Sequence, residues 1–162
     1  MRILVLGLGN ELYGDDGVGI EAVRRLREER ESGPEEREGE AEITLLECSL
    51  SGAALLDVVS GHDALVIIDT IVRENPETGR IHLLDASEIR DVPGPSPHYI
   101  SVPQTLALGR GLGLSMPGSV KVIGIEAKGI YSLGEGLSAE MTRRIPAILD
   151  AARSVIRELI SP

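Results

Sequence analysis

Residues 3–17 have the sequence ILVLGLGNELYGDDG, in which an unbroken aliphatic run leads into a glycine-rich turn with two adjacent acids. The run predicts a strand over residues 2–9 that is buried on both faces, as strands at the centre of a parallel sheet are. Gly7 and Gly9 permit a positive φ and a close backbone approach, and Asn10 tolerates the left-handed region. A buried strand that ends in this way predicts a binding site at its carboxyl end.

The two adjacent acids, Asp15 and Asp16, cannot point in the same direction, so we expect one carboxylate to enter the site and the other to face away. The outward carboxylate is suited to cap the helix predicted to begin near Gly17, where unpaired N–H groups and the helix dipole favour an anion. On this motif alone, the alternative that both acids only cap that helix is equally well supported.

The rest of the chain alternates predicted strands with predicted helices, which is typical of a parallel sheet covered on both faces. Further strands are predicted at residues 43–46, 64–68, 80–84 and 119–124, and helices at 17–31, 51–59, 102–112 and after Ser138. The turn at 75–79 is too short for a crossover helix, so the strand that follows it is expected to be antiparallel. We therefore predict a single three-layer α/β/α domain over residues 1–162, with a mainly parallel twisted sheet and one antiparallel strand.

The C-terminal helix that Ser138 caps has an amphipathic pattern. Its predicted core face consists of Met141, Ile145, Ile148, Leu149, Ala152, Val155, Ile156 and Leu159. Pro146 lies within this pattern and is expected either to kink the helix or to mark its true start.

The composition limits the classes of function. The formal net charge is −10, so nucleic acid and anionic membranes are disfavoured partners, because most of the surface would repel them. Cys48 is the only cysteine, and no long apolar or signal-like segment precedes the first strand. We therefore expect a cytoplasmic protein without membrane insertion.

Asp16, Asp69 and His98 are the side chains that the predicted fold can bring together. In a doubly wound sheet the active crevice lies beyond the carboxyl ends of the parallel strands, and both acids follow such ends. His98 ends a proline-rich loop, residues 91–98, whose rigidity fixes the direction of the imidazole. Two carboxylates and an imidazole suit a borderline divalent ion such as zinc, nickel, cobalt, manganese or iron, and three ligands leave positions open for a partner's group.

Less specific interpretations of the same residues stay open. Asp69 can cap a turn or bond to Thr70, and His98 can be a surface residue that caps the following helix. His62, in a turn, and His82, in a predicted edge strand, are each interpreted as surface residues.

Two other chemistries are compatible with parts of the sequence. The stretch Gly7–Asn10 is similar to the start of a dinucleotide-binding loop, but Leu12 occupies the position of the third glycine, and Glu47 is an equivocal match for the acid after the second strand. Cys48 with His98 could form a nucleophile and its base, although a lone cysteine beside a strand is more often a packing residue.

Five segments together resemble the hydrogenase maturation endopeptidases, the nickel-dependent processing proteases of NiFe hydrogenase large subunits. These segments are MRILVLGLGN at 1–10, GDDGVG at 14–19, the aliphatic run of residues 63–69, SPH at 96–98 and VIGIE at 122–126. They cover nearly the whole chain in the family's order, and their joint occurrence is specific although no single motif is.

This resemblance implies an endopeptidase that removes a C-terminal extension from the large-subunit precursor after nickel insertion. It implies metal ligands at Asp16, Asp69 and His98, which match the acid, the Asp and the His that the family uses. Nickel is then supplied in the substrate, and zinc or cadmium can also occupy the site. Family classification groups such enzymes with aspartic-type hydrolases, but no conventional nucleophile is assigned. The candidate substrate contacts are Gly9, Asn10 and Asp15.

The sequence departs from the family in two places. After the second strand many relatives carry an Asp-Gly-Gly-Thr or similar turn, whereas this chain has ECSLSG at 47–52. The charged segment 28–42 is longer and more acidic than expected, and is interpreted as a solvated helix end plus loop, with an acidic docking surface as the alternative. A second class of function, a metal-sensing chaperone of hydrogenase assembly without proteolysis, also fits the predicted site.

Overall fold

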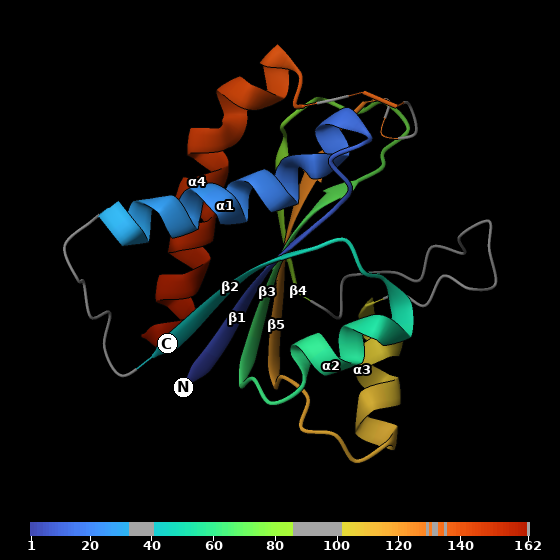
Figure 1. Ribbon diagram of the computed structural model, residues 1–162, viewed down its shortest axis with the longest axis vertical. Coiled ribbons are helices and arrows are strands. Elements are labelled where there is room, and N and C mark those ends of the chain that lie inside the picture. The colour runs from blue at the N-terminus through green and yellow to red at the C-terminus, as the bar shows by residue number, and fades with distance from the viewer. Residues whose placement is uncertain (33–40, 86–101, 129, 131–132, 135, 162) are drawn as a thin grey trace.

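The structure, a computed structural model, describes residues 1–32, 41–85, 102–128, 130, 133–134 and 136–161, and within these residues the chain forms a five-stranded sheet (Figure 1). The strands are β1 (Arg2–Leu8), β2 (Glu42–Cys48), β3 (Ala64–Ile71), β4 (Ile81–Asp85) and β5 (Ser119–Glu126). Their order in the sheet is β2-β1-β3-β5-β4, and all neighbours are parallel except β4, which pairs antiparallel with β5. The predicted sheet, mainly parallel with one antiparallel strand, is confirmed.

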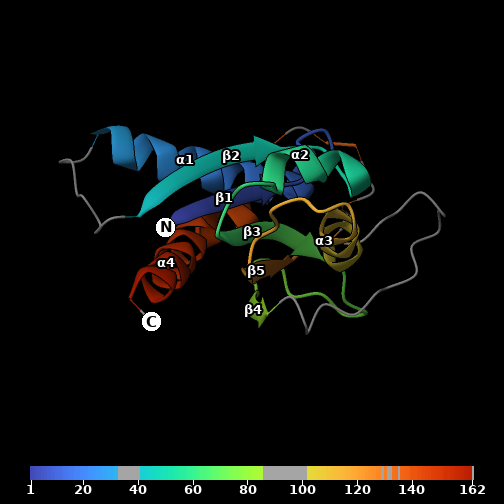
Figure 2. The ribbon, with the colours of Figure 1, turned by 90° about the horizontal axis from the view of Figure 1, so that it is seen from below.

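Helices cover both faces of this sheet, which confirms the predicted three layers. Helices α1 (Val18–Ser32) and α4 (Ala139–Ile160) lie on one face, and α2 (Leu55–Val59) and α3 (Val102–Gly111) lie on the other. Figure 1 shows α1 crossing α4 on one side and α2 beside α3 on the other, and Figure 2 shows the sheet between these two pairs. Short 3-10 turns, η1 (Gly14–Gly17) and η2 (Gly52–Ala54), precede α1 and α2. No helix within the described residues is long and apolar enough to span a membrane.

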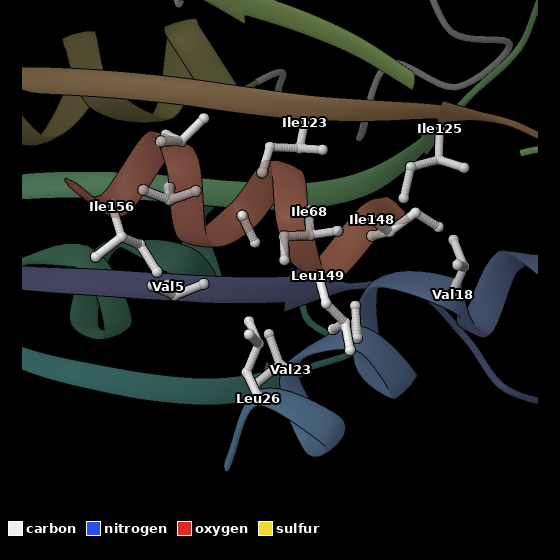
Figure 3. Close-up of a cluster of buried hydrophobic side chains, with 14 of the residues drawn as sticks. Val5, Val18, Val23, Leu26, Ile68, Ile123, Ile125, Ile148, Leu149 and Ile156 are labelled. Atoms are coloured by element: carbon white, nitrogen blue, oxygen red, sulfur yellow. The ribbon is translucent and has the colours of Figure 1, made fainter. Parts of the chain in front are cut away.

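Aliphatic side chains fill the space between the sheet and each pair of helices. Along β3, Val66 and Ile68 pack toward α1 and α4, whereas Leu65 and Ile67 pack toward α2 and α3. Figure 3 shows the first of these cores, in which residues from the strands, α1 and α4 interdigitate. The predicted core face of α4 is confirmed: Met141, Ile148, Leu149, Ala152, Val155 and Ile156 are buried, and Ile145 and Leu159 are partly buried against them.

Strand β3 extends beyond the predicted residues 64–68, because it keeps pairing with β5 after its pairing with β1 has ended. Its pairing with β1 ends at Gly7 opposite Ile68, but its pairing with β5 continues to Ile71 opposite Glu126. Asp69 therefore lies within β3 rather than after it. From Asp69 onward one edge of β3 no longer pairs with β1, which is the place where a doubly wound sheet forms its crevice.

Helix α4 begins where the sequence predicted. The Ser138 hydroxyl accepts a hydrogen bond from the N–H of Met141 at 3.1 Å, so Ser138 is the N-cap. Pro146 lies inside α4, and the alternative that it marks the start of the helix is wrong.

Helix α1 begins in close contact with the sheet because two residues at the contact have no side chain. A Cβ at Gly19 would lie 2.2 Å from the carbonyl oxygen of Ile68 and 2.3 Å from that of Leu8. A Cβ at Gly7 would lie 2.2 Å from the carbonyl oxygen of Gly19. Either side chain would push α1 away from β1 and β3, so this contact fixes the position of η1 at the edge of the sheet.

We expect Gly19→Ala to lower the free energy of unfolding by about 1–3 kcal/mol or more, because the methyl group forces α1 off two strands. Gly111→Ala is the matched control, since Gly111 ends α3 and a Cβ there meets no described atom within 4 Å outside its own helix. Urea denaturation followed by circular dichroism measures both variants. A Gly19→Ala variant as stable as Gly111→Ala would contradict the close contact.

Candidate active site

The loop between β1 and α1 folds back so that Asp16 lies against its beginning. Gly9 has a φ of +145°, and a Cβ there would lie 1.9 Å from the carbonyl oxygen of Asp16. The N–H of Asn10 donates to Asp16 Oδ2 at 2.9 Å, and Asn10 Oδ1 accepts from the N–H of Leu12 at 3.0 Å. Position 9 therefore requires glycine both for its backbone angle and for the space that Asp16 occupies.

Asp16 and Asp69 are brought together through Thr70. The Thr70 hydroxyl donates to Asp16 Oδ1 at 2.7 Å, and the Thr70 N–H donates to Asp69 Oδ1 at 2.8 Å. The two acids therefore lie at the same edge of the sheet, as the sequence predicted, and the alternative contact between Asp69 and Thr70 is present as well. Their role as metal ligands stays a prediction.

His98, the third residue of the predicted site, lies outside the described residues, as does the proline-rich loop that carries it. In the part of the chain that the structure describes, no three His, Cys, Asp or Glu side chains lie close enough to hold a metal ion. Asp16 and Asp69 together would supply two hard oxygen ligands, and a divalent ion with an incomplete protein shell fits such a donor set.

The surroundings of Asp69 raise the pKa of its carboxyl group. Desolvation of its carboxyl group raises its pKa most, the N–H of Thr70 opposes this, and the negative charge of Asp16 raises the pKa further, to about 7. Two carboxylates at one edge therefore repel each other when both are ionised, and a cation between them would relieve this repulsion.

Asp15 faces away from Asp16, but it does not cap α1 as the sequence analysis suggested. It is 8% exposed, and its two oxygens accept from the N–H of Ser138 at 2.7 Å and from the Ser138 hydroxyl at 2.9 Å. The sequence could not show this contact, because the two residues are 123 positions apart. The candidate site loop is consequently tied to the start of α4, and the proposed substrate contact at Asp15 stays untested.

A groove of about 340 Å³ lies beside the loop, between Leu12 and the end of β2. Glu47 lines it and pairs with Arg27 at 2.6 Å and with Arg24 at 3.0 Å. Burial opposes ionisation of Glu47, but the hydrogen bonds from the two guanidinium groups outweigh it and lower the pKa. Glu47 is thus an ion-pair residue, which argues against a role in dinucleotide binding.

Cys48 is buried at the end of β2, where its Sγ accepts from the N–H of Leu50 at 3.4 Å. This environment supports the interpretation of Cys48 as a packing residue. The alternative pairing with His98 falls outside the described residues.

The other two histidines, His62 and His82, were predicted to be surface residues, but the structure partly buries both. His82 lies in the edge strand β4, as expected, but its Nε2 is 2.7 Å from Oε1 of the buried Glu126 and its side chain is 24% exposed. The N–H of Glu77 and His82 together lower the pKa of Glu126. His62 is partly buried, and its Nδ1 has no hydrogen-bond partner among the described residues. The sequence did not lead us to predict that Glu126 is buried and bonded to His82, although an acid that ends an aliphatic strand indicates such a role.

Fold and site together define the class: a doubly wound α/β protein with an acidic crevice beyond the carboxyl ends of its central strands. Comparison with known families agrees with this class. The family model described as hydrogenase maturation protease matches residues 20–155, a range that includes Asp69 and His98 and begins just after Asp16.

Individual relatives extend the match over almost the whole chain. The hydrogenase 2 maturation protease of Escherichia coli (strain K12) is 28% identical over 160 residues, which cover 98% of this chain and 92% of that protein. The hydrogenase expression/formation protein HupD of Rhizobium leguminosarum bv. viciae is 28% identical over 159 residues, covering 96% and 74%. The structure of the hydrogenase maturating endopeptidase HybD from E. coli superposes with a TM-score of 0.77 at 27% identity, covering 98% and 93%. The chain belongs to the hydrogenase maturation protease family.

We expect Asp69→Asn to be more stable than the wild type at pH 8 in metal-free buffer, because the folded wild type must then hold an ionised, desolvated carboxylate. The folded pKa of about 7 lies above the ordinary value of about 3.9, so the folded state binds the proton more tightly and the cost disappears as the pH falls. In urea denaturation the difference should stay constant above about pH 7 and shrink as the pH falls from about 7 towards about 4, the range between the folded and the ordinary pKa. Asp57→Asn, which neutralises an exposed acid of α2, should show no gain at pH 8. A pH-independent effect of Asp69→Asn would contradict the raised pKa.

Proposed function

We propose that this chain removes the C-terminal extension of a NiFe hydrogenase large-subunit precursor, and that it does so only after nickel has been inserted into the precursor. The family supplies the general activity, maturation proteolysis of a hydrogenase. The two acids at the edge of the sheet support a bound divalent cation, and nickel is the ion that the family resemblance implies. We also propose that residues 1–162 act as one such domain.

One observation carries this proposal: two carboxylates from distant segments share one threonine at the edge of the sheet, and one of them is desolvated enough to resist ionisation. Such an arrangement favours a bound cation, because a divalent ion neutralises both charges at once. We assign Asp16, Asp69 and His98 as the groups that contact it. Carboxylate and imidazole ligands are compatible with nickel, and also with zinc or cadmium in its place.

In this proposal nickel belongs to the substrate and reaches the site within the precursor. The precursor's cysteines hold the ion from one side, and the three residues of this chain hold it from the other. The ion then polarises the scissile carbonyl or activates a water molecule, so that no serine or cysteine nucleophile is needed. We propose that the precursor segment next to the nickel contacts Gly9, Asn10 and Asp15, which lie around Asp16.

Kinetics on nickel-loaded and nickel-free precursor test the proposal. Mass spectrometry of the large subunit should show a released peptide only for the loaded precursor with the wild-type chain. Asp16→Ala, Asp69→Ala and His98→Ala should each lower the cleavage rate by more than about 100-fold, since losing a ligand costs more than losing an outer-shell partner, for which 10- to 100-fold is typical. Asp57→Ala, which removes an exposed carboxylate of α2, serves as the control and should cleave normally.

Full activity of all three ligand variants would contradict the assigned site. Cleavage of nickel-free precursor at the same rate would contradict recognition through the metal. Association with the loaded precursor without any released peptide would instead indicate a metal-sensing chaperone.

A further inference from the structure

We infer that Thr70 is a positioning residue for this site, whose hydroxyl holds the Asp16 carboxylate in the orientation that lets it share an ion with Asp69. The inference rests on the proposed function, because it assigns to Thr70 a role in the same metal site. It concerns a residue that would not itself bind the ion.

Thr70 is suited to this role by its place in β3. Successive side chains of a strand point to opposite faces, and Ile68 packs toward α1, so Thr70 also points toward the α1 side of the sheet while Asp69 points toward the other side. Asp16 lies in η1, immediately before α1. Thr70 is therefore the strand residue that can reach Asp16, and its hydroxyl does so at 2.7 Å.

One residue contacts both acids through two different groups. The Thr70 hydroxyl donates to Asp16, and the backbone N–H of the same residue donates to Asp69 at 2.8 Å. A substitution at this position leaves the N–H in place and removes only the hydroxyl. The contact to Asp16 can consequently be tested without disturbing the hydrogen bond to Asp69.

The hydroxyl has a definite task because the two carboxylates repel each other. Asp16 is held by two donors among the described residues, the N–H of Asn10 on Oδ2 and the Thr70 hydroxyl on Oδ1. Without the hydroxyl only Oδ2 keeps its donor, so the carboxylate can rotate away from Asp69 toward water. Before an ion could bind both acids, the Asp16 carboxylate would have to return to its original orientation, which weakens binding. The loss of an outer-shell hydrogen bond of this kind typically weakens metal binding 10- to 100-fold.

Three variants separate positioning from general stability. Thr70→Val keeps the branched shape that suits a strand and removes the hydroxyl, whereas Thr70→Ser restores a hydroxyl on a smaller side chain. Thr105→Val is the matched control, because the buried Thr105 hydroxyl donates to the carbonyl oxygen of Gly52 at 3.3 Å, in another part of the fold. Should Thr70→Val fail to fold, Thr70→Ala removes the same hydroxyl without adding an apolar branch.

Calorimetric titration of the purified, metal-free chain with Ni²⁺ alone measures the effect directly. Thr70→Val should bind Ni²⁺ 10- to 100-fold more weakly than the wild type, while Thr70→Ser and Thr105→Val should stay within about 3-fold of it. The kcat/KM for nickel-loaded precursor should fall by a similar factor in Thr70→Val and recover in Thr70→Ser.

Wild-type affinity in Thr70→Val, or no recovery in Thr70→Ser, would overturn the inference. If the wild-type chain itself binds no free Ni²⁺, the ion needs the precursor's cysteines as well as this chain, as the proposed function allows. The role of Thr70 is then decided by cleavage alone, where unchanged kcat/KM in Thr70→Val overturns it.

Discussion

The structure depends on the contact that Gly19 makes with the backbone of two parallel strands. Since a Cβ there would lie 2.2 Å from the carbonyl oxygen of Ile68 and 2.3 Å from that of Leu8, far inside van der Waals contact, α1 can start directly at the edge of the sheet only with glycine in this place. The turn η1 is thereby fixed beside β3, just where β3 loses β1 as its partner. The positions of the crevice and of Asp16 therefore both depend on the close packing of Gly19 against the two strands.

The acids around this crevice differ in what balances their charge. Glu11 and Glu47 both pair with Arg24, and Asp15 is satisfied by Ser138. Asp16 and Asp69, like Asp15, are bonded only to uncharged donors in the described segments of the chain, and they share one of them, Thr70. Asp16 and Asp69, which meet the same threonine and have no basic partner in the described segments, are the two acids assigned to the substrate's nickel.

Much of this could be predicted from the sequence, because the signals are local. Aliphatic runs predicted the strands, helical spacing predicted the core face of α4, and acids near the carboxyl ends of strands predicted that Asp16 and Asp69 would meet. Contacts that depend on how distant segments align could not be predicted. The bonds of Asp15 to Ser138, of Thr70 to Asp16 and of Glu126 to His82 follow from strand register and helix placement, which no single stretch of sequence encodes.

If Asp16 and Asp69 bind one ion together, anomalous diffraction from crystals soaked in Zn²⁺ will locate that ion. We expect a single ion with carboxylate oxygens of both residues at about 2.0–2.2 Å, the usual distance for zinc. An ion bound to only one of the two acids, or found solely at other positions on the protein, would contradict this expectation.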